Sequence, residues 1–173
     1  MLSAADENAL VAYIAGLPFK EFEFRGYRGK RRVVSFGWRY DFNKAKLEQV
    51  EDIPAPLLSL RGAAALVAQI PAEEFQQVLV TEYSTGAAIG WHKDRPMFAE
   101  IVGISLLAPC TFRLRRRYAE SWERISVGLQ PRSAYLLSGA ARNEWEHSIP
   151  SVDSLRYSIT FRNFKSERMP DSS

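Results

Sequence analysis

The feature that most restricts the fold of this chain is a strict alternation of polar and apolar side chains near its C-terminus. The apolar members share one parity: Leu155, Tyr157, Ile159 and Phe161. The polar members share the other: Arg156, Ser158, Thr160 and Arg162. Because successive side chains of a β-strand point to opposite faces, the pattern predicts a strand with one apolar and one polar face.

Further strands are expected through the second half of the chain, where short apolar runs are separated by turn residues. They are residues 76–83, 101–107, 111–117, 122–129 and 133–137. Two helices are expected before them, at residues 4–15 and 57–70, with Ser3 as the cap of the first. The charged segment 44–53 is expected to be a loop. Helices followed by many short strands predict a single α+β domain over residues 1–173, built on a double-sheet jelly roll.

The composition bears on the location of the protein and on its binding partners. No run approaches the ~20 apolar residues that a membrane span requires. Cys110 is the only cysteine, which excludes an internal disulfide and favours a reducing, cytoplasmic location. The formal net charge is +3, which mildly favours a polyanionic partner.

A basic segment follows the first helix, and we interpret residues 19–42 as strand, basic turn, strand. The cations of this turn are Arg25, Arg28, Lys30, Arg31 and Arg32. Tyr27 and two glycines lie among them, and positive charge beside aromatic rings is typical of nucleic-acid-binding surfaces. A solvated hairpin tip explains the same residues, so both interpretations stay open here.

Two side chains with metal-binding chemistry lie close together at His92 and Asp94. On an extended segment their side chains point the same way, and the chain holds one other histidine, His147. If the three meet, they form the two-His-one-carboxylate set that binds Fe(II) with positions open for oxygen. A zinc site would use the same ligands plus water. A serine hydrolase is disfavoured, because the chain has no Gly-x-Ser-x-Gly motif.

The polar face of segment 155–164 carries an arginine at each end. Guanidinium groups bind carboxylates in a bidentate fork, so Arg156 and Arg162 together could hold a short dicarboxylate. Tyr83 ends the strand that leads toward His92 and could donate a hydrogen bond to the same ligand. The alternative is an outer strand whose polar face lies in water.

Four blocks of the sequence together resemble the AlkB-type iron(II)/2-oxoglutarate dioxygenases. They are Glu82-Tyr83-Ser84-Thr85-Gly86, His92-Lys93-Asp94, Ala141-Arg142 through Trp145 to His147-Ser148-Ile149-Pro150, and Arg156-Tyr157-Ser158-Ile159-Thr160-Phe161-Arg162. The resemblance runs over about residues 19–164. It implies a double-stranded β-helix (jelly roll) with flanking N-terminal helices, a substrate-recognition lid at about residues 19–45, and a jelly-roll core at about residues 76–164.

The resemblance also implies the chemistry of the site. His92, Asp94 and His147 would bind Fe(II) and form the catalytic centre. Molecular oxygen would oxidise the cosubstrate 2-oxoglutarate to succinate and carbon dioxide. A methyl group on a substrate nitrogen would be hydroxylated and lost as formaldehyde.

The cosubstrate contacts are implied in the same way. Arg156 and Tyr83 would hold the distal carboxylate of 2-oxoglutarate, and Arg162 the carboxylate beside its keto group. Thr81 stands where better-known members have an asparagine, so a shorter hydroxyl would replace an amide contact. We include Thr81 and Ser158 among the residues expected to contact the cosubstrate.

Two further residues depart from the family pattern, and the first of them concerns the substrate. Pro96 replaces an acidic residue that contacts the damaged base in better-known members, and Asn143 replaces a tyrosine. The loss of an acceptor at residue 96 weakens the case for methylated adenine or cytosine. The segment Phe36–Tyr40 nevertheless resembles the aromatic and basic lid of members that act on nucleic acid.

The function expected from these features is oxidative demethylation of N-alkylated nucleobases in DNA or RNA, as in repair of alkylation damage. The residues expected to contact the substrate are Trp38, Tyr40, Trp91, Arg31 and Arg32. The alternative is a demethylase or hydroxylase that acts on protein or tRNA, and a non-catalytic nucleic-acid-binding module is a third hypothesis. We expect a monomer with no obligate protein partner and no membrane association.

Overall fold

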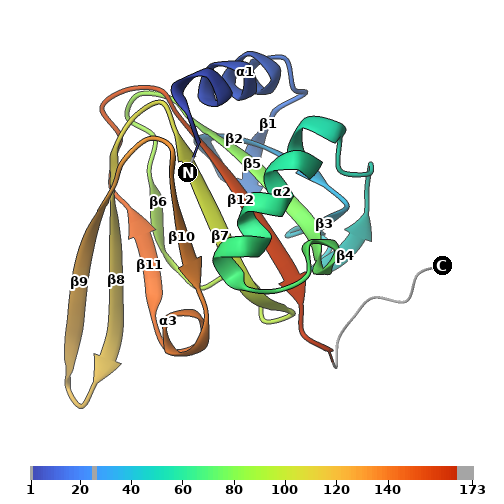
Figure 1. Ribbon diagram of the computed structural model, residues 1–173. Coiled ribbons are helices and arrows are strands. Elements are labelled where there is room, and N and C mark those ends of the chain that lie inside the picture. Colours follow the sequence, from blue (N-terminus) through green and yellow to red (C-terminus); the bar gives the residue numbers. More distant parts are fainter. Residues whose placement is uncertain (1, 25–26, 167–173) are drawn as a thin grey trace.

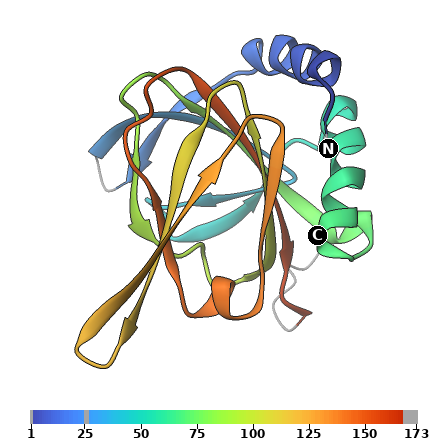
Figure 2. The same ribbon diagram turned by 60° about the vertical axis from the view of Figure 1, so that its left-hand side comes forward.

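The computed structural model describes residues 2–24 and 27–166, with the side chains of residues 23–24 and 27–29 left out. Two antiparallel sheets face each other in it (Figures 1 and 2). The major sheet has the order β1 (Lys20–Phe24), β2 (Tyr27–Phe36), β5 (Phe75–Tyr83), β12 (Arg156–Phe164), β7 (Phe98–Leu106) and β10 (Ser133–Leu137). The minor sheet has the order β6 (Ile89–His92), β11 (Glu146–Ile149), β8 (Cys110–Tyr118) and β9 (Ser121–Leu129).

The remaining elements flank this core. Strands β3 (Trp38–Asp41) and β4 (Lys46–Gln49) form a separate two-stranded sheet. The helices are α1 (Ala4–Ala15), α2 (Ala55–Ala68) and α3 (Gly139–Asn143), with a short 3-10 turn at Ala72–Glu74. The predicted α+β jelly roll is confirmed. In the described part of the chain, no helix is both long and apolar enough to cross a membrane.

Helices α1 and α2 cover the outer face of the major sheet (Figure 1). Ser3 and Asp6 form a capping box at the start of α1, in which each side chain accepts a hydrogen bond from the other residue's backbone N–H. The helices bury Ile14 and Leu57 against the strands, where Val78, Ile159 and Phe161 are fully buried. This apolar layer holds the major sheet in place and contains none of the polar side chains of the candidate site.

Strand β12 explains the alternating pattern of the sequence. It lies between β5 and β7, with Arg156 opposite Tyr83 and Arg162 opposite Gln77 on β5. Its apolar side chains join the helix-covered layer, and its polar side chains point into the space between the two sheets. The alternative prediction of an outer strand with a solvated polar face is therefore wrong, because both faces of β12 are buried.

The sequence-based expectations were wrong at three places in the strand assignment. Lys30, Arg31 and Arg32 lie inside β2 and not in a turn, while Arg25 lies outside the described residues. Segment 44–53 contains β4 in place of a simple loop. Strands β6 and β11 were not expected as separate elements, and both are only four residues long.

Candidate metal and cosubstrate site

A pocket lies between the two sheets and is lined almost entirely by strand side chains. The major sheet contributes β2, β5, β7, β10 and β12, and the minor sheet contributes β6, β8 and β11. The major sheet supplies hydroxyl groups, Arg31 and Arg162, and the minor sheet supplies the two imidazoles. The pocket therefore brings a cluster of possible metal ligands together with positive charge.

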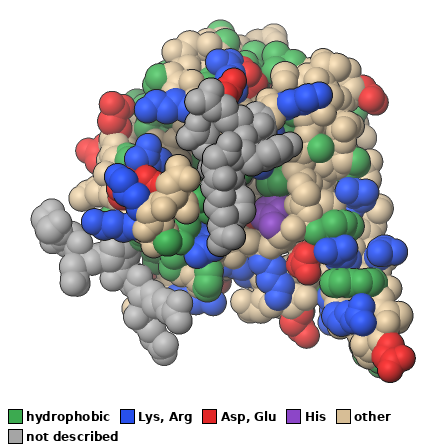
Figure 3. All heavy atoms as spheres, turned by 180° about the vertical axis from the view of Figure 1, so that it is seen from behind, with side chains coloured by type: hydrophobic (Ala, Val, Ile, Leu, Met, Phe, Trp, Pro, Cys, Tyr) green, Lys and Arg blue, Asp and Glu red, His purple; other side chains and the backbone are tan. Residues whose placement is uncertain are grey.

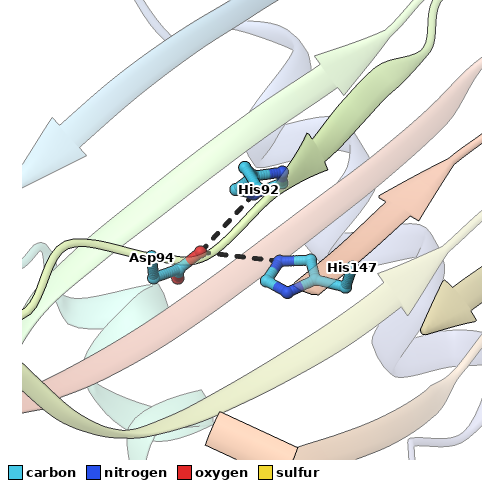
Figure 4. Close-up of side chains that lie close together, drawn as sticks. All are labelled: His92, Asp94 and His147. Carbon is cyan, nitrogen blue, oxygen red and sulfur yellow. Dashed lines mark ion pairs between the residues drawn. The ribbon is translucent and has the colours of Figure 1, made fainter. Parts of the chain in front are cut away.

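The register of β6 and β11 brings the two histidines together. His92 and His147 are direct cross-strand partners, and their ring centroids lie 4.3 Å apart (Figure 4). Asp94 follows β6 by two residues, and its Oδ1 lies 3.5 Å from Nε2 of His92 and 3.5 Å from Nε2 of His147. One ligand atom from each of the three residues lies within 4.8 Å of the others. This arrangement could hold one metal ion.

Both imidazoles are held by contacts on the side away from Asp94. Nδ1 of His92 lies 2.8 Å from the carbonyl oxygen of Gly90, which is the distance of a hydrogen bond donated by that nitrogen. This tautomer leaves the lone pair of Nε2 facing the site, as metal coordination requires. The ring of His147 stacks on Phe112 with 5.2 Å between centroids. The two rings are therefore oriented before any ion binds.

Asp94 is kept ionised although it is buried. Burial by itself would raise the pKa of this carboxyl, but the Arg162 guanidinium and the two imidazoles outweigh burial and hold the pKa well below its usual range. Nε of Arg162 donates to Oδ2 of Asp94 over 2.8 Å, while Nη1 of Arg162 donates to Gln77. The other carboxylate oxygen, Oδ1, faces the histidines.

Arg156 packs against Tyr83, a residue that lines the pocket. The Arg156 side chain is fully buried, and its guanidinium carbon lies 5.0 Å from the centre of the Tyr83 ring. Its Nε donates to Ser105, but its Nη1 has no hydrogen-bond partner among the described residues. A buried guanidinium nitrogen without a partner is costly, and an anionic ligand would satisfy it. Thr81 and Ser158, also buried, line the same pocket as cross-strand partners.

The structure separates the two basic residues that were expected to bind substrate together. Arg31 is the cross-strand partner of Tyr83 and lines the pocket, where burial lowers the pKa of its guanidinium. Arg32 points to the opposite side of the strand. It makes a bidentate ion pair with Glu82, with donor–acceptor distances of 2.6 and 2.8 Å. Only Arg31 is therefore placed where a molecule in the pocket could reach it.

Trp38 and Tyr40, the aromatic residues of the expected lid, make different contacts. Trp38 packs edge-on against Phe164 of β12, with ring centroids 6.0 Å apart. The Tyr40 hydroxyl accepts a hydrogen bond of 2.8 Å from Arg95, whose guanidinium also lies over the Tyr40 ring. Arg95 directly follows Asp94, so Tyr40 connects the lid to the segment that carries the carboxylate.

Trp91 does not point into the pocket. It precedes His92 on β6, so its side chain lies on the opposite face of the minor sheet, where it contacts Arg113 and Arg115. Its location leaves open a contact with substrate outside the pocket.

Two residues of the pocket region were not singled out from the sequence for a role in the site. Tyr135 of β10 lines the pocket opposite Gly103 of β7, and a Cβ atom at Gly103 would come within 2.2 Å of the tyrosine ring. The pairing of a glycine with a large ring could have been found only with the strand register. Arg142 is buried and donates to the carbonyl oxygens of Arg95 and Phe98, so it fixes the segment that follows Asp94.

The donor set and the pocket fit an iron ion with a dicarboxylate cosubstrate. Two imidazole nitrogens and one carboxylate oxygen on one side of a metal leave its other positions open, which is typical of Fe(II) oxygenases. Arg31, Arg156 and Arg162 give the pocket region three positive charges, and among the described residues Asp94 is the only carboxylate that lines it. A jelly roll with this site defines the class of non-haem iron oxygenases.

Comparison with known proteins places the chain in this class. The model of the 2OG-Fe(II) oxygenase superfamily matches residues 21–162, and the chain belongs to that family. Its members use Fe(II), 2-oxoglutarate and O2, so the protein is a dioxygenase. Proteins named as AlkB homologues are among those that the chain resembles.

Three relatives support this placement. An Arabidopsis thaliana protein named "Alkylated DNA repair protein ALKBH8 homolog" is 26% identical over 167 residues, covering 78% of this chain. The chain spans only 46% of that relative's length. Uncharacterized protein L905 of Acanthamoeba polyphaga mimivirus is 26% identical over 148 residues, covering 75% of this chain and 70% of its own. The solved structure of OsALKBH1 shares the fold, with a TM-score of 0.67, 17% identity, and 94% of this chain and 93% of that chain covered.

Proposed function

We propose that this dioxygenase removes N-alkyl groups from nucleobases of DNA or RNA, with His92, Asp94 and His147 as the iron ligands. The observation that carries the catalytic part is the convergence of these three side chains in one pocket with a buried, incompletely satisfied Arg156. The nucleic-acid part is supported by the name of the Arabidopsis relative and by the positive charge around the pocket. The single cysteine, which has no disulfide partner, favours a cytoplasmic location.

In this proposal the side chains of the pocket have separate roles in binding the metal and the cosubstrate. When bound, the iron supplies the oxygen chemistry that hydroxylates the alkyl group. Arg156 and Tyr83 hold the distal carboxylate of 2-oxoglutarate, with Thr81 and Ser158 alongside, and Arg162 holds the carboxylate near the metal. To reach that carboxylate, Arg162 must share its N–H groups between the cosubstrate and Asp94, which it already contacts.

The substrate side of the pocket is proposed to use Arg31 and the lid. Arg31 lines the pocket without a carboxylate partner among the described residues, so it is available to an anionic or carbonyl group of the substrate. Tyr40 and Trp38 offer aromatic surface next to the segment that carries Asp94. A base removed from its stack could be held there between planar side chains.

A second candidate function is oxidation of a protein or tRNA substrate. Pro96 favours it, because this residue lines an open cleft beside Asp94 and offers no acceptor for an exocyclic amino group. Lys93 and Arg95 line the same cleft. A cationic cleft is compatible with RNA as well as with an acidic segment of a protein.

One assay separates these functions. Purified protein is supplied with Fe(II), 2-oxoglutarate and ascorbate, and is given methylated oligonucleotides or methyl-lysine peptides in parallel. We expect formaldehyde and succinate in equal amounts with the oligonucleotides, and neither product with a His92→Ala variant. Formaldehyde release from peptides alone would refute the nucleic-acid proposal. Absence of succinate from the wild-type protein with iron bound would refute the catalytic one.

A further inference from the structure

A row of arginine and tryptophan side chains covers the face of the minor sheet that points away from the pocket. We call it the arginine–tryptophan face, and its members are Trp91, Arg113, Arg115, Arg117, Trp122 and Arg124. Leu114 is the cross-strand partner of His147, whose side chain points into the pocket. Because side chains alternate along a strand, the flanking arginines of β8 project to the opposite face.

The planar groups of this face stack in sequence. The guanidinium of Arg115 lies 4.4 Å from the centre of the Trp91 ring and 4.3 Å from that of Trp122. Arg113 lies over Trp91 at 5.1 Å, and Arg117 over Trp122 at 5.4 Å. A guanidinium that stacks through its flat surface keeps its N–H edge free for an anion. Stacking therefore fixes the arginines in place without using up their hydrogen bonds.

The charge of this face is poorly compensated. The face itself carries four arginines, and the one carboxylate that pairs with any of these four in the described structure is Glu146, which lies 3.2 Å from Arg115. Arg113 donates to the hydroxyl of Ser148, a neutral group. Arg117 and Arg124 are exposed and have no carboxylate partner within the described ranges. Nε of Arg115 is buried there without an acceptor.

The location of the face relates it to the candidate site. Trp91 directly precedes His92, so the face begins one residue from a proposed iron ligand and extends along the projecting β8–β9 hairpin (Figures 1 and 2). In Figure 3 blue and green side chains alternate along this arm, on the same side of the molecule as the visible histidine surface. A long ligand could lie on the arm while one of its units reaches the pocket.

We propose that the arginine–tryptophan face binds the phosphate backbone of the nucleic-acid substrate. Arg113, Arg115 and Arg117 follow each other at every second residue of one strand, which spaces them by ~6.7 Å along a straight row. Such a row suits a polymer with regularly spaced anions, and the indole rings between the cations suit the bases of the same polymer. An acidic protein segment would use the charges but not the half-buried indole rings. The identity of the polymer rests on the function proposed above.

Titration of the intact protein with an unmethylated fluorescent oligonucleotide, without iron or cosubstrate, tests the proposal. Arg117→Glu and Arg124→Glu should each weaken binding roughly tenfold at low salt and flatten the dependence of log K on log salt by about one unit for each phosphate that is no longer bound. Arg132→Glu is the matched control, because Arg132 is exposed in the turn between β9 and β10 and its replacement changes the net charge equally. This control should leave the slope nearly unchanged.

Arg117→Gln and Arg124→Gln, with thermal unfolding monitored, separate weaker phosphate binding from damage to the hairpin. Equal decreases in affinity in the Arg132 control, or an unchanged affinity in the Arg117 and Arg124 variants, would overturn the inference. So would displacement of the oligonucleotide by polyglutamate at the same charge concentration. The titration does not depend on turnover. If the wild-type protein demethylates oligonucleotides but the variants bind them with unchanged affinity, only the proposed surface is rejected. If the variants bind more weakly but no demethylation is detected, only the proposed reaction is rejected.

Discussion

At the scale of single residues, the site depends on buried charges that compensate each other only in part. Asp94 is satisfied by Arg162 and faces two histidines, and its carboxylate stays ionised despite burial. Arg156 is fully buried, with one nitrogen lacking a partner in the described structure. Buried charges without full compensation are costly for stability, so a protein that retains one can use it to bind an oppositely charged ligand.

Arg156→Lys tests this use of the charge. Lysine keeps the positive charge but loses the planar fork that binds a carboxylate at two points. We expect the KM for 2-oxoglutarate to rise by at least about tenfold, which corresponds to ~1.4 kcal/mol. Iron affinity should change little, because Arg156 lies at the Tyr83 end of the pocket and does not contact the proposed ligands.

The matched control is Arg32→Lys. Arg32 also lies on a strand of the major sheet and pairs with Glu82, but it points away from the pocket. Steady-state kinetics at varied 2-oxoglutarate concentration should give nearly the wild-type KM for this variant. If both variants show the same KM, or if Arg156→Lys lowers only iron affinity, Arg156 has no special part in holding the cosubstrate.

At the scale of elements, strand pairing determines which side chains can share the pocket. Gly103 of β7 and Tyr135 of β10 are direct partners, and the tyrosine ring lies across the glycine. A Cβ atom at residue 103 would lie 2.2 Å from Cζ and 2.3 Å from Cε1 of the ring, far inside van der Waals contact. The missing side chain of Gly103 is therefore what lets Tyr135 line the pocket.

Gly103→Ala should destabilise the protein by about 1–3 kcal/mol, the usual range for overpacking a core. Chemical unfolding measures this difference. Gly128→Ala on β9 is the control, since a Cβ atom there meets nothing within 4 Å, and it should leave stability nearly unchanged. In a Tyr135→Leu background the cost of Gly103→Ala should fall. An equal cost in both backgrounds would show that the tyrosine ring is not the group that collides.

The accuracy of sequence-based prediction also differed from element to element. Strand β12 was predictable because both its faces are chemically uniform. Helix α1 was predictable from its cap and apolar spacing, and α2 from its spacing alone. Strand β2 was mistaken in part for a turn because Arg31 and Arg32 look like surface residues. Arg31 interacts with Tyr83 and Arg32 pairs with Glu82, each about fifty positions away, and no local pattern reveals such pairs.

The candidate site shows the same limit. His92, Asp94 and His147 could be proposed as ligands from the sequence, because histidine is rare in this chain and the motif spacing is specific. That β6 and β11 are direct neighbours could not be derived locally, since each strand has four residues and a mixed pattern. The outward direction of Trp91 depends on the same pairing and was not foreseen.

At the scale of the whole molecule, the apolar layer and the polar pocket occupy opposite faces of the major sheet. The buried cluster under α1 and α2 contains no proposed ligand, while the second cluster, between the sheets, surrounds the pocket. The fold should therefore persist without the metal. Ligands should stabilise the pocket, where the like-charged arginines lie.

Iron and 2-oxoglutarate, added together without oxygen, should raise the midpoint of thermal unfolding. Each ligand that binds only the folded state at one hundred times its Kd adds about 2.7 kcal/mol, and ~1 kcal/mol corresponds to roughly 2–4 °C for a chain of this size. A rise of about 5–10 °C is thus expected for one such ligand. His92→Ala should lose most of the iron-dependent rise and still unfold cooperatively, because the helix-covered layer is untouched. Loss of cooperative unfolding in this variant would mean that the cluster around His92 is structural, and the separation of stability from chemistry would then be wrong.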